Sequence, residues 1–250
     1  MIDAFALVSY CDSLLNAAAF ADYAPNGLQV EGERPIRVLI SGVTACAALI
    51  AAAAEAEADA LLVHHGWFWK GENPCLVGPK GRRARALLAS GASLLAYHLP
   101  LDAHPLYGNN ATLGRRLGFL DSQPSAVANG LVWTGRLAEP LTPLDWAQSV
   151  SARLGRQAML VDPGRGTVGR VAWCTGSGQG YLESAAGLGV DAFLSGEISE
   201  QTTHLARELG VAYLAAGHHA TERYGVAALG THLAEHFRLQ HRFIEIPNPA

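Results

Sequence analysis

The chain has 250 residues, of which 50% are hydrophobic and 16% are charged, so it can bury a sizeable core as one domain or as two packed lobes. Its net charge of −4 provides no positive field for tight non-specific binding to nucleic acid, so a nucleic-acid partner is not favoured. No apolar run is long enough to span a membrane, residues 1–23 form an amphipathic pattern without a basic leader, and the four cysteines show no CxxC spacing. We therefore expect a cytoplasmic protein with no membrane partner.

The first predicted elements form a β-strand–helix–β-strand pattern that then continues with a helix and a third strand. In order, these elements are strand 37–40, an alanine-rich helix, strand 59–63, helix 82–89 and strand 91–98. The third strand ends at His98, and Asp102 follows four residues later.

The same pattern recurs in the second half of the chain. In order, its elements are strand 170–174, a glycine-rich turn, helix 182–187, strand 191–194, helix 201–209 and strand 210–218. This third strand also ends in a histidine, His218, with an acid, Glu222, four residues later. The first copy is longer by 12 residues between its second strand and its terminal histidine, which the aromatic loop over residues 67–79 can hold.

The repeat predicts an α/β fold with two related halves packed face to face and a metal site in the crevice between them, because ligand crevices of such sheets lie at the carboxyl ends of strands. The predicted domains are a first half over residues 1–124, a connector over residues 125–168, and a second half over residues 169–250 whose C-terminal helix returns to the shared site. The connector carries a strand (126–137) and a helix (143–154). The alternative is that βαβ patterns resemble each other through general physics alone.

His64 and His65 lie at the end of a predicted apolar strand, where it gives way to a loop. Adjacent residues of a regular strand point to opposite faces, so two neighbouring histidines cannot easily share one ion but can serve two. This favours a paired-metal site, although a His-His pair alone is as consistent with a structural role. Asp102, placed just after a predicted strand, supports ligation.

His218 and Glu222 form the second pair of candidate ligands. A histidine and a glutamate four residues apart lie on one face of a helix, one turn apart, so both can reach a common ion. Imidazole and carboxylate together suit zinc, iron, manganese, cobalt or nickel, and they do not choose among these metals.

Several motifs together closely resemble the family of GTP cyclohydrolase I type 2 homologues, also called Ngg-one-interacting-factor-three-like, and in particular its short, YbgI-type branch. The resemblance covers essentially the whole chain. The motifs are Asn26-Gly-Leu-Gln-Val30, Val63-His-His-Gly-Trp-Phe-Trp-Lys-Gly71, Tyr97-His-Leu-Pro-Leu-Asp-Ala-His-Pro105 with Gly108-Asn-Asn110, Gly196-Glu-Ile-Ser-Glu-Gln201 and Gly217-His-His-Ala-Thr-Glu-Arg223.

The resemblance implies a toroidal homohexamer with two divalent metal ions in each subunit. Carried over to this sequence, His64 and Asp102 would bind one ion, His65 and His218 the other, and Glu222 would bridge both. Longer members of the family insert a further domain between the halves, and this chain is too short to hold it, so no function of that insert is implied.

Other residues are weaker candidates. His98 is a candidate proton shuttle or a group that merely orients Asp102 through a hydrogen bond. Trp67, Trp69 and Lys70 are candidate substrate-binding residues that could stack on a heterocycle and contact a phosphate, although loop anchoring or subunit contact accounts for them as well.

Two further features near the predicted crevice have competing explanations. Glu197 occupies the repeat position of His65, although a place in the first turn of a helix also explains it. The glycine-rich turn over residues 176–180 could face an anion, but a tight turn is the safer interpretation.

The resulting function hypothesis is a metal-dependent hydrolase that acts on a carbon–nitrogen bond of a small cyclic amide or nucleotide-like ring. The physiological substrate and the identity of the metals stay open at this point. The alternative is a non-catalytic ring-shaped scaffold or metal-handling protein. A regulator that contacts nucleic acid draws only on the family's interaction-derived name, and the net charge speaks against it.

Overall fold

The described residues form two β-sheets, each flanked by its own helices. This computed structural model describes residues 1–164 and 166–250, and the chain divides into two units. Unit 1 comprises Met1–Leu101 and Val226–Pro247, and unit 2 comprises Asp102–Gly225 and Asn248–Ala250. Helices α4 (Leu99–Ala103) and α9 (His218–Phe237) contribute residues to both units.

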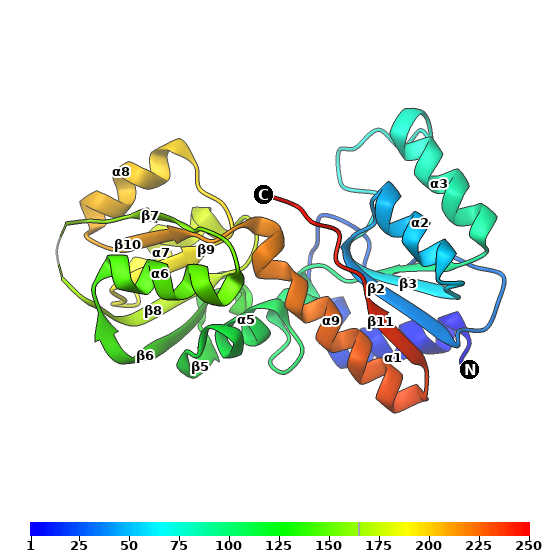
Figure 1. Cartoon of the computed structure of the whole chain (residues 1–250), viewed down its shortest axis with the longest axis horizontal. Helices are drawn as coiled ribbons and strands as arrows, with labels where there is room; N and C mark the ends of the chain where they lie inside the picture. Colours follow the sequence, from blue (N-terminus) through cyan, green and yellow to red (C-terminus); the bar gives the residue numbers. More distant parts are fainter. Residues whose placement is uncertain (165) are drawn as a thin grey trace. The chain divides into compact units, whose positions relative to one another are not determined.

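The sheet of unit 1 has the strand order β1-β4-β3-β2-β11, of which β2, β3 and β11 are labelled in Figure 1. Its strands are β1 (Gly27–Val30), β2 (Val38–Thr44), β3 (Ala60–His65), β4 (Ser93–Ala96) and β11 (Gln240–Phe243). Four of them run parallel, and only β1 pairs antiparallel with its neighbour. β2, β3 and β4 confirm the predicted strands, whereas the sequence pattern does not predict β1 and β11.

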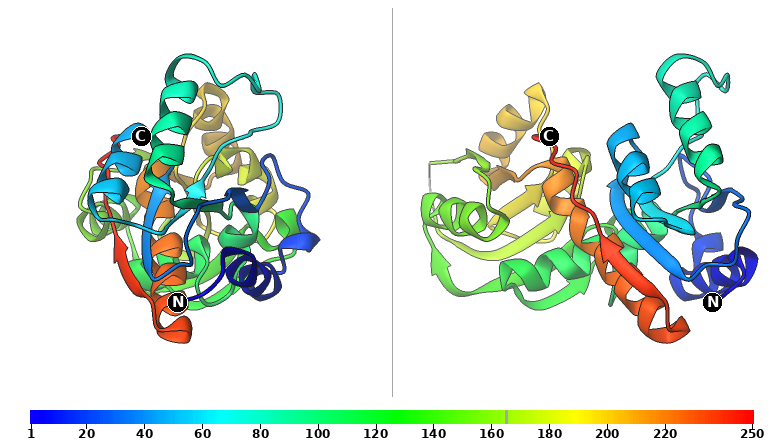
Figure 2. Two further views of the ribbon diagram at one scale, coloured as in Figure 1. Left: turned by 90° about the vertical axis from the view of Figure 1, so that its right-hand side faces the viewer. Right: turned by 45° about the vertical axis from the view of Figure 1, so that its right-hand side comes forward.

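Helices cover both faces of this sheet (Figures 1 and 2). They are α1 (Ala4–Leu15), the 3₁₀ turn η1 (Ala17–Ala19), α2 (Ala47–Glu55), α3 (Gly78–Ser90) and the part of α9 that belongs to unit 1. Because successive strand residues point to opposite faces, Leu61 packs in the cluster with α2 and α3, and Leu62 packs in the cluster with α1 and α9. Both leucines are fully buried, and each such burial contributes about 1.5–3 kcal/mol of transfer free energy.

Unit 2 has a six-stranded sheet with the order β5-β6-β8-β9-β10-β7. Its strands are β5 (Leu120–Pro124), β6 (Trp133–Leu141), β7 (Met159–Val161), β8 (Val168–Cys174), β9 (Ala192–Ser195) and β10 (Ala212–Ala215). β8, β9 and β10 run parallel, as the repeat predicts, and β5, β6 and β7 add antiparallel pairings. The predicted strand over residues 126–137 is wrong at its start, because Val127–Gly130 forms the 3₁₀ turn η2, with Ala128 and Asn129 at positive φ.

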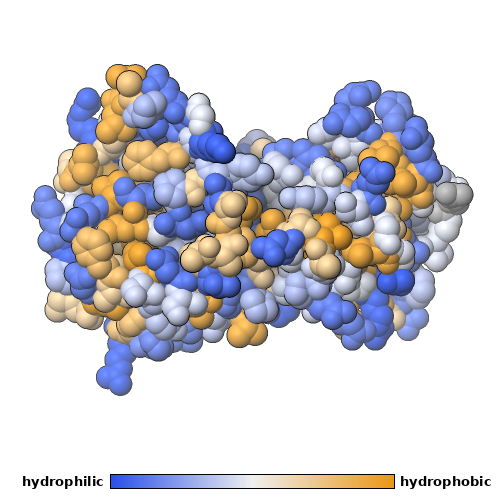
Figure 3. All heavy atoms as spheres, turned by 180° about the vertical axis from the view of Figure 1, so that it is seen from behind, coloured by the Kyte–Doolittle hydropathy of each residue, from blue (hydrophilic) through white to orange (hydrophobic). Residues whose placement is uncertain are grey.

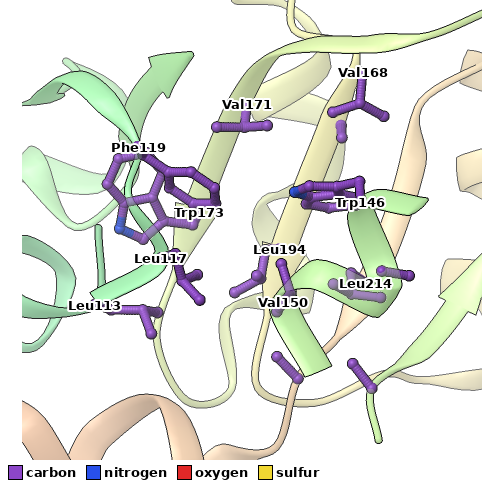
Figure 4. Packing of buried hydrophobic residues seen from close by; sticks show 14 of the residues in the cluster. Leu113, Leu117, Phe119, Trp146, Val150, Val168, Val171, Trp173, Leu194 and Leu214 are labelled. Atoms are coloured by element: carbon purple, nitrogen blue, oxygen red, sulfur yellow. The ribbon is translucent and has the colours of Figure 1, made fainter. Parts of the chain in front are cut away.

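The core of unit 2 lies between its sheet and the helices α5 and α6 (Figure 4). The helices of this unit are α5 (Asn109–Leu117), α6 (Pro143–Leu154), α7 (Leu182–Ala186) and α8 (Glu200–Leu209), with the 3₁₀ turn η3 (Gly178–Tyr181). Trp146 of α6 and Trp173 of β8 are both buried here, and the ring of Phe119 lies 5.0 Å from that of Trp173. α6 matches the helix predicted over residues 143–154.

Side chains at the helix ends explain where several helices begin and stop. The Asp3 carboxylate accepts hydrogen bonds from the first N–H groups of α1, and Thr142 caps α6 in the same way. Ser199 and Thr202 form a capping box at the start of α8. Glycines at positive φ follow the last turns of four helices, namely Gly91, Gly118, Gly155 and Gly210.

The internal repeat is visible in equivalent hydrogen bonds of the two units. In unit 1 the Asp59 carboxylate accepts hydrogen bonds from the N–H groups of Arg37 and Val38. In unit 2 the Asp191 carboxylate accepts hydrogen bonds from Gly169 and Arg170 in the same way. Each aspartate precedes the second strand of its βαβ pattern. The two halves therefore share these hydrogen bonds as well as the order of their three parallel strands.

The division into units differs from the predicted domains. The predicted connector (125–168) is no separate segment among its described residues, since β6 and β7 pair within the sheet of unit 2 and α6 packs on its core; position 165 lies outside the described residues. Residues 102–124 belong to unit 2, and Val226–Pro247 belongs to unit 1.

Hydrophobic and hydrophilic residues lie interspersed on the face that Figure 3 shows, and neither kind covers an extended part of it. Among the described residues, no helix combines the length and the apolar composition that crossing a membrane requires.

Candidate metal centre

Three histidines of unit 1 lie close together at the carboxyl ends of β3 and β4. The ring centroids of His64 and His65 are 4.6 Å apart, and the His98 ring lies 5.0 Å from His64 and 5.7 Å from His65. One ring nitrogen of each lies within 4.8 Å of the others, so this group could hold a metal ion. The argument that adjacent strand residues keep the two rings apart is wrong here, because His65 is the last residue of β3 and its ring turns beside that of His64.

The Nδ1 atoms of the two adjacent histidines have defined hydrogen-bond partners. The Nδ1 atom of the fully buried His64 lies 2.9 Å from the carbonyl oxygen of Tyr97, and that of His65 lies 3.2 Å from Thr44 Oγ1. A carbonyl oxygen can only accept, so His64 carries its proton on Nδ1 and its lone pair on Nε2. Metal-binding histidines are typically oriented in this way.

Asp22 is a residue of this group that the sequence analysis missed. Its side chain is 3% exposed, and its Oδ1 atom lies 2.7 Å from His98 Nδ1. Its carboxylate also accepts hydrogen bonds from Asn26 Nδ2 and from the N–H of Leu99. Burial opposes ionisation, but the hydrogen bonds and charge of His98, with the amide of Asn26, outweigh it and lower the pKa of Asp22 to about 2.

The motif Asn26-Gly-Leu-Gln-Val30 holds the histidine loops in place. Asn26 Oδ1 accepts a hydrogen bond from the N–H of His98 at 2.8 Å. Gln29 pairs with Trp67, accepting from its N–H and donating to its carbonyl oxygen. The motif therefore positions the loops that follow β3 and β4.

The aromatic loop separates into a core residue and two residues nearer the surface. Trp67 is 4% exposed, packs in the core beneath α2 and α3, and donates from Nε1 to the carbonyl oxygen of Ala45, so it anchors the loop and is not available to a substrate. Trp69 is partly exposed, and its ring lies 5.0 Å from His98 and 5.8 Å from His65. Lys70 is exposed.

In unit 2, His218 and Glu222 form the one-turn pair that their spacing predicts. His218 Nε2 lies 2.9 Å from Glu222 Oε2, and the Glu222 side chain is 4% exposed. His218 Nδ1 lies 2.7 Å from Glu197 Oε1. Burial lowers the pKa of His218, but the two carboxylates outweigh it and raise that pKa to about 9, while the hydrogen bond from His218 lowers the pKa of Glu197.

Asp102 is a buried carboxylate held by the Asn109-Asn110 pair and a threonine. Its Oδ1 atom accepts hydrogen bonds from Asn109 Nδ2 at 2.8 Å and from Thr175 Oγ1 at 3.2 Å. Asn110 donates to the carbonyl oxygen of Asp102 and accepts from the N–H of Thr175. The asparagines of this motif thus fix the orientation of one candidate ligand.

The glycine-rich turn after β8 packs directly against Glu222. Gly176 has a φ of +64°, and a Cβ atom there would lie 2.0 Å from Glu222 Oε1. Its N–H donates to Thr221 Oγ1, and its carbonyl oxygen accepts from Ser195. These bonds favour the tight-turn interpretation over an anion cradle at this residue.

A comparison with protein families matches residues 3–249 to Duf34/NIF3 (NGG1p interacting factor 3). The chain belongs to the Duf34/NIF3 family. Among curated relatives, the GTP cyclohydrolase 1 type 2 homolog of Allochromatium vinosum is 70% identical over 250 residues, which cover 100% of this chain and 98% of that protein. The relative of the same name from Escherichia coli (strain K12) is 51% identical, over 94% of this chain and 95% of that protein.

Solved structures agree with this family membership. A structural-genomics structure of the protein ybgI, described as of unknown function, has a TM-score of 0.95 and 49% identity, with 100% of both chains covered. The protein TTHA1606 from Thermus thermophilus has a TM-score of 0.88 and 36% identity, again over 100% of both chains. The resemblance based on motifs and the α/β fold with two related halves are therefore confirmed.

The donor chemistry in each unit of this Duf34/NIF3 chain fits a divalent transition metal. Unit 1 supplies imidazoles, and unit 2 supplies an imidazole with two carboxylates, Asp102 and Glu222, that are 6% and 3% exposed. Buried carboxylates are costly unless hydrogen bonds and positive charge compensate them. A cation is the partner that such a set of nitrogen and oxygen donors suits.

Proposed function

We propose that this chain binds two divalent transition-metal ions through His64, His65, Asp102, His218 and Glu222, and that it is a metal-dependent hydrolase. The proposed substrate class is a small cyclic amide or nucleotide-like ring, in which water cleaves a carbon–nitrogen bond so that the carbon gains the hydroxyl group and the nitrogen gains the proton. The name of its curated relatives, GTP cyclohydrolase 1 type 2 homolog, supports this class.

The observation that carries the proposal is the placement and orientation of the donors inside each unit. His64 and His65 end β3, and His218 begins the helix that follows β10, so the donors occupy carboxyl ends of parallel strands. A carbonyl oxygen holds Nδ1 of His64, and the Glu197 carboxylate holds Nδ1 of His218. In both rings Nε2 is therefore the atom that can bind a metal ion.

In the proposed arrangement, His64 and Asp102 would hold one ion, His65 and His218 would hold the other, and Glu222 would contribute to holding both. This partition rests on the family resemblance. Bound there, two such ions would supply a water-derived nucleophile near neutral pH and would polarise the electrophile. Asn109 and Thr175 hold Asp102 in a fixed orientation, so this donor needs no rearrangement to bind.

The metal part of the proposal is tested by the metal content of protein purified without chelators. We expect two ions per chain in the wild type, and clearly fewer in His64→Ala and Glu222→Ala. His204→Ala is the matched control, because His204 is an exposed histidine that pairs with an exposed glutamate, Glu200. Unchanged stoichiometry in both site variants would overturn the ligand assignment.

The catalytic part is tested by product release from GTP and a panel of small cyclic amides with metal-loaded protein. Turnover that disappears in Glu222→Ala and persists in His204→Ala supports a hydrolase. Two bound ions with no turnover on any substrate of the panel would favour the second candidate, a metal-handling or scaffold protein.

The family resemblance also leads us to propose a homohexamer. Native mass spectrometry of the full chain tests this proposal, since a monomer or dimer at micromolar concentration contradicts it.

A further inference from the structure

We propose that His98 is an additional metal ligand, bound to the same ion as His64, and that Asp22 is the residue that positions it. This inference deepens the proposed function, because it adds a donor to the same metal centre. All three side chains belong to unit 1, so the argument depends on that unit alone.

The first support is the spacing of the three rings. One ring nitrogen from each histidine lies within 4.8 Å of the others. Imidazole nitrogens bind transition metals at about 2.0–2.1 Å, so two nitrogens on one tetrahedral ion lie about 3.3 Å apart. The nitrogens of His64 and His98 therefore need to approach each other by about 1.5 Å at most to share one ion.

The second support is the hydrogen bond that fixes the His98 ring. The Asp22 carboxylate can only accept, so the His98 Nδ1 atom 2.7 Å away carries a proton, and the lone pair of a neutral ring is on Nε2. His64 has the same pattern with the carbonyl oxygen of Tyr97 as its acceptor. A carboxylate or carbonyl behind each imidazole is the usual arrangement for histidines that bind metals through Nε2.

The third support is the rigidity of the Asp22 anchor. Its carboxylate also accepts from Asn26 and from the N–H of Leu99, and Asn26 in turn accepts from the N–H of His98. The Trp69 ring meets the His98 ring edge-on, with an angle of 85° between their planes. Both the ring and the backbone of His98 are thus held from several sides. A residue that only anchors a loop does not need its ring fixed in this way, whereas a metal ligand does.

The experiment uses the full chain loaded with cobalt(II) and observed by NMR. An imidazole that binds cobalt through Nε2 gives a strongly shifted, exchangeable Nδ1–H signal, so the shifted signals count the histidine ligands. We expect one such signal for each of His64, His65, His98 and His218 in the wild type. The signal of His98 should vanish in His98→Gln, and cobalt affinity should fall by about 10–100-fold in both His98→Gln and Asp22→Asn.

The controls separate this inference from the proposed function. His241→Gln removes a partly buried histidine of unit 1 that bonds Ser41 and should change neither signals nor affinity. Wild-type signals and affinity in a folded His98→Gln protein would overturn the inference and leave the proposed metal site standing. A wild-type protein that binds no cobalt would overturn the proposed function itself.

A purely structural role for Asp22 has its own signature. In that case Asp22→Asn lowers the melting temperature but leaves the His98 signal and the cobalt affinity unchanged, which would refute the positioning role. If His98→Gln does not fold, the number of shifted signals in the wild type still decides whether His98 is a ligand.

Discussion

Units 1 and 2 place different side chains at equivalent positions of one βαβ frame. Ala60 and Ala192 pair with equivalent residues of the preceding strand, and His65 and Glu197 each lie five residues beyond them. His98 and His218 follow the third strand of their units. In unit 1, His98 therefore has the imidazole of His65 as its neighbour. In unit 2, His218 has the carboxylate of Glu197 as its neighbour, at a distance of 2.7 Å.

The shared βαβ pattern therefore determines where a side chain lies but not which residue type occupies that position. Unit 1 concentrates nitrogen donors, which suit borderline metals such as zinc, cobalt or nickel, and unit 2 adds the oxygen donors that manganese and iron also accept. The anchors differ as well, since Asp22 comes from outside the repeated elements with a side chain that is 3% exposed, and Glu197 lies within them and is 43% exposed.

The largest expected effect is that of Gly176→Ala in unit 2. The new Cβ atom would overlap Glu222 Oε1, and the residue would also keep a positive φ, so we expect a loss of about 3 kcal/mol in the free energy of unfolding together with weaker metal binding. Gly155→Ala is the control, because Gly155 has a φ of +70° with no atom within 4 Å of the added Cβ, and should cost only about 1 kcal/mol. Equal losses in urea denaturation would contradict the proposed crowding of Glu222.

Asp59→Ala and Asp191→Ala remove equivalent carboxylate–backbone hydrogen bonds from the two units. Both aspartates accept two backbone N–H bonds, but Asp59 is buried and also pairs with Arg34, whereas Asp191 is exposed. We expect losses in the free energy of unfolding of about 3 kcal/mol for Asp59→Ala and about 1 kcal/mol for Asp191→Ala, because a buried donor left unsatisfied costs more than a solvated one. Urea denaturation of both variants measures this difference, and a reversed order would show that burial does not set it.

The sequence predicts the parts of this design that depend on local patterns. The apolar runs locate β2, β3, β8 and β9, and the spacing of His218 and Glu222 predicts their contact across one helical turn. Asp22 could not be predicted in this way, because it lies 76 residues from its partner His98 and its neighbourhood has no periodic pattern. The short strands β1 and β11 were equally invisible, since their pairing with distant strands defines them.

Burial of the aromatic loop was also beyond the sequence pattern. Trp67 and Trp69 are two residues apart in the same loop, yet one is a core residue and the other lies against His65 and His98. What separates them is the contact of Trp67 with Gln29 and Ala45, both distant in sequence. Residue type alone therefore cannot assign a substrate contact.

A smaller effect is expected from Glu197→Gln, which tests the anchor of unit 2. Glutamine can still accept a hydrogen bond from His218 Nδ1 but lacks the charge, so we expect the affinity for one metal ion to fall by about 10-fold with little change in unfolding free energy. Glu200→Gln serves as the control, because Glu200 is an exposed helix residue that contacts His204. Competition with a chelating dye measures both affinities, and equal values in the two variants would show that Glu197 does not position His218.

The native cysteines allow the unfolding of each unit to be followed without any substitution. Burial raises the pKa of Cys11 in unit 1 to about 12 and raises that of Cys174 in unit 2, whereas Cys75 is exposed. With iodoacetamide at pH 8, mass spectrometry should find Cys75 modified in the native protein and the two buried cysteines protected, since thiolate and access are both required. As urea is raised, simultaneous modification of Cys11 and Cys174 indicates that the units open together. Modification of one well before the other indicates that they differ in local stability, and the unit that opens first is then the one whose ligands are less firmly held.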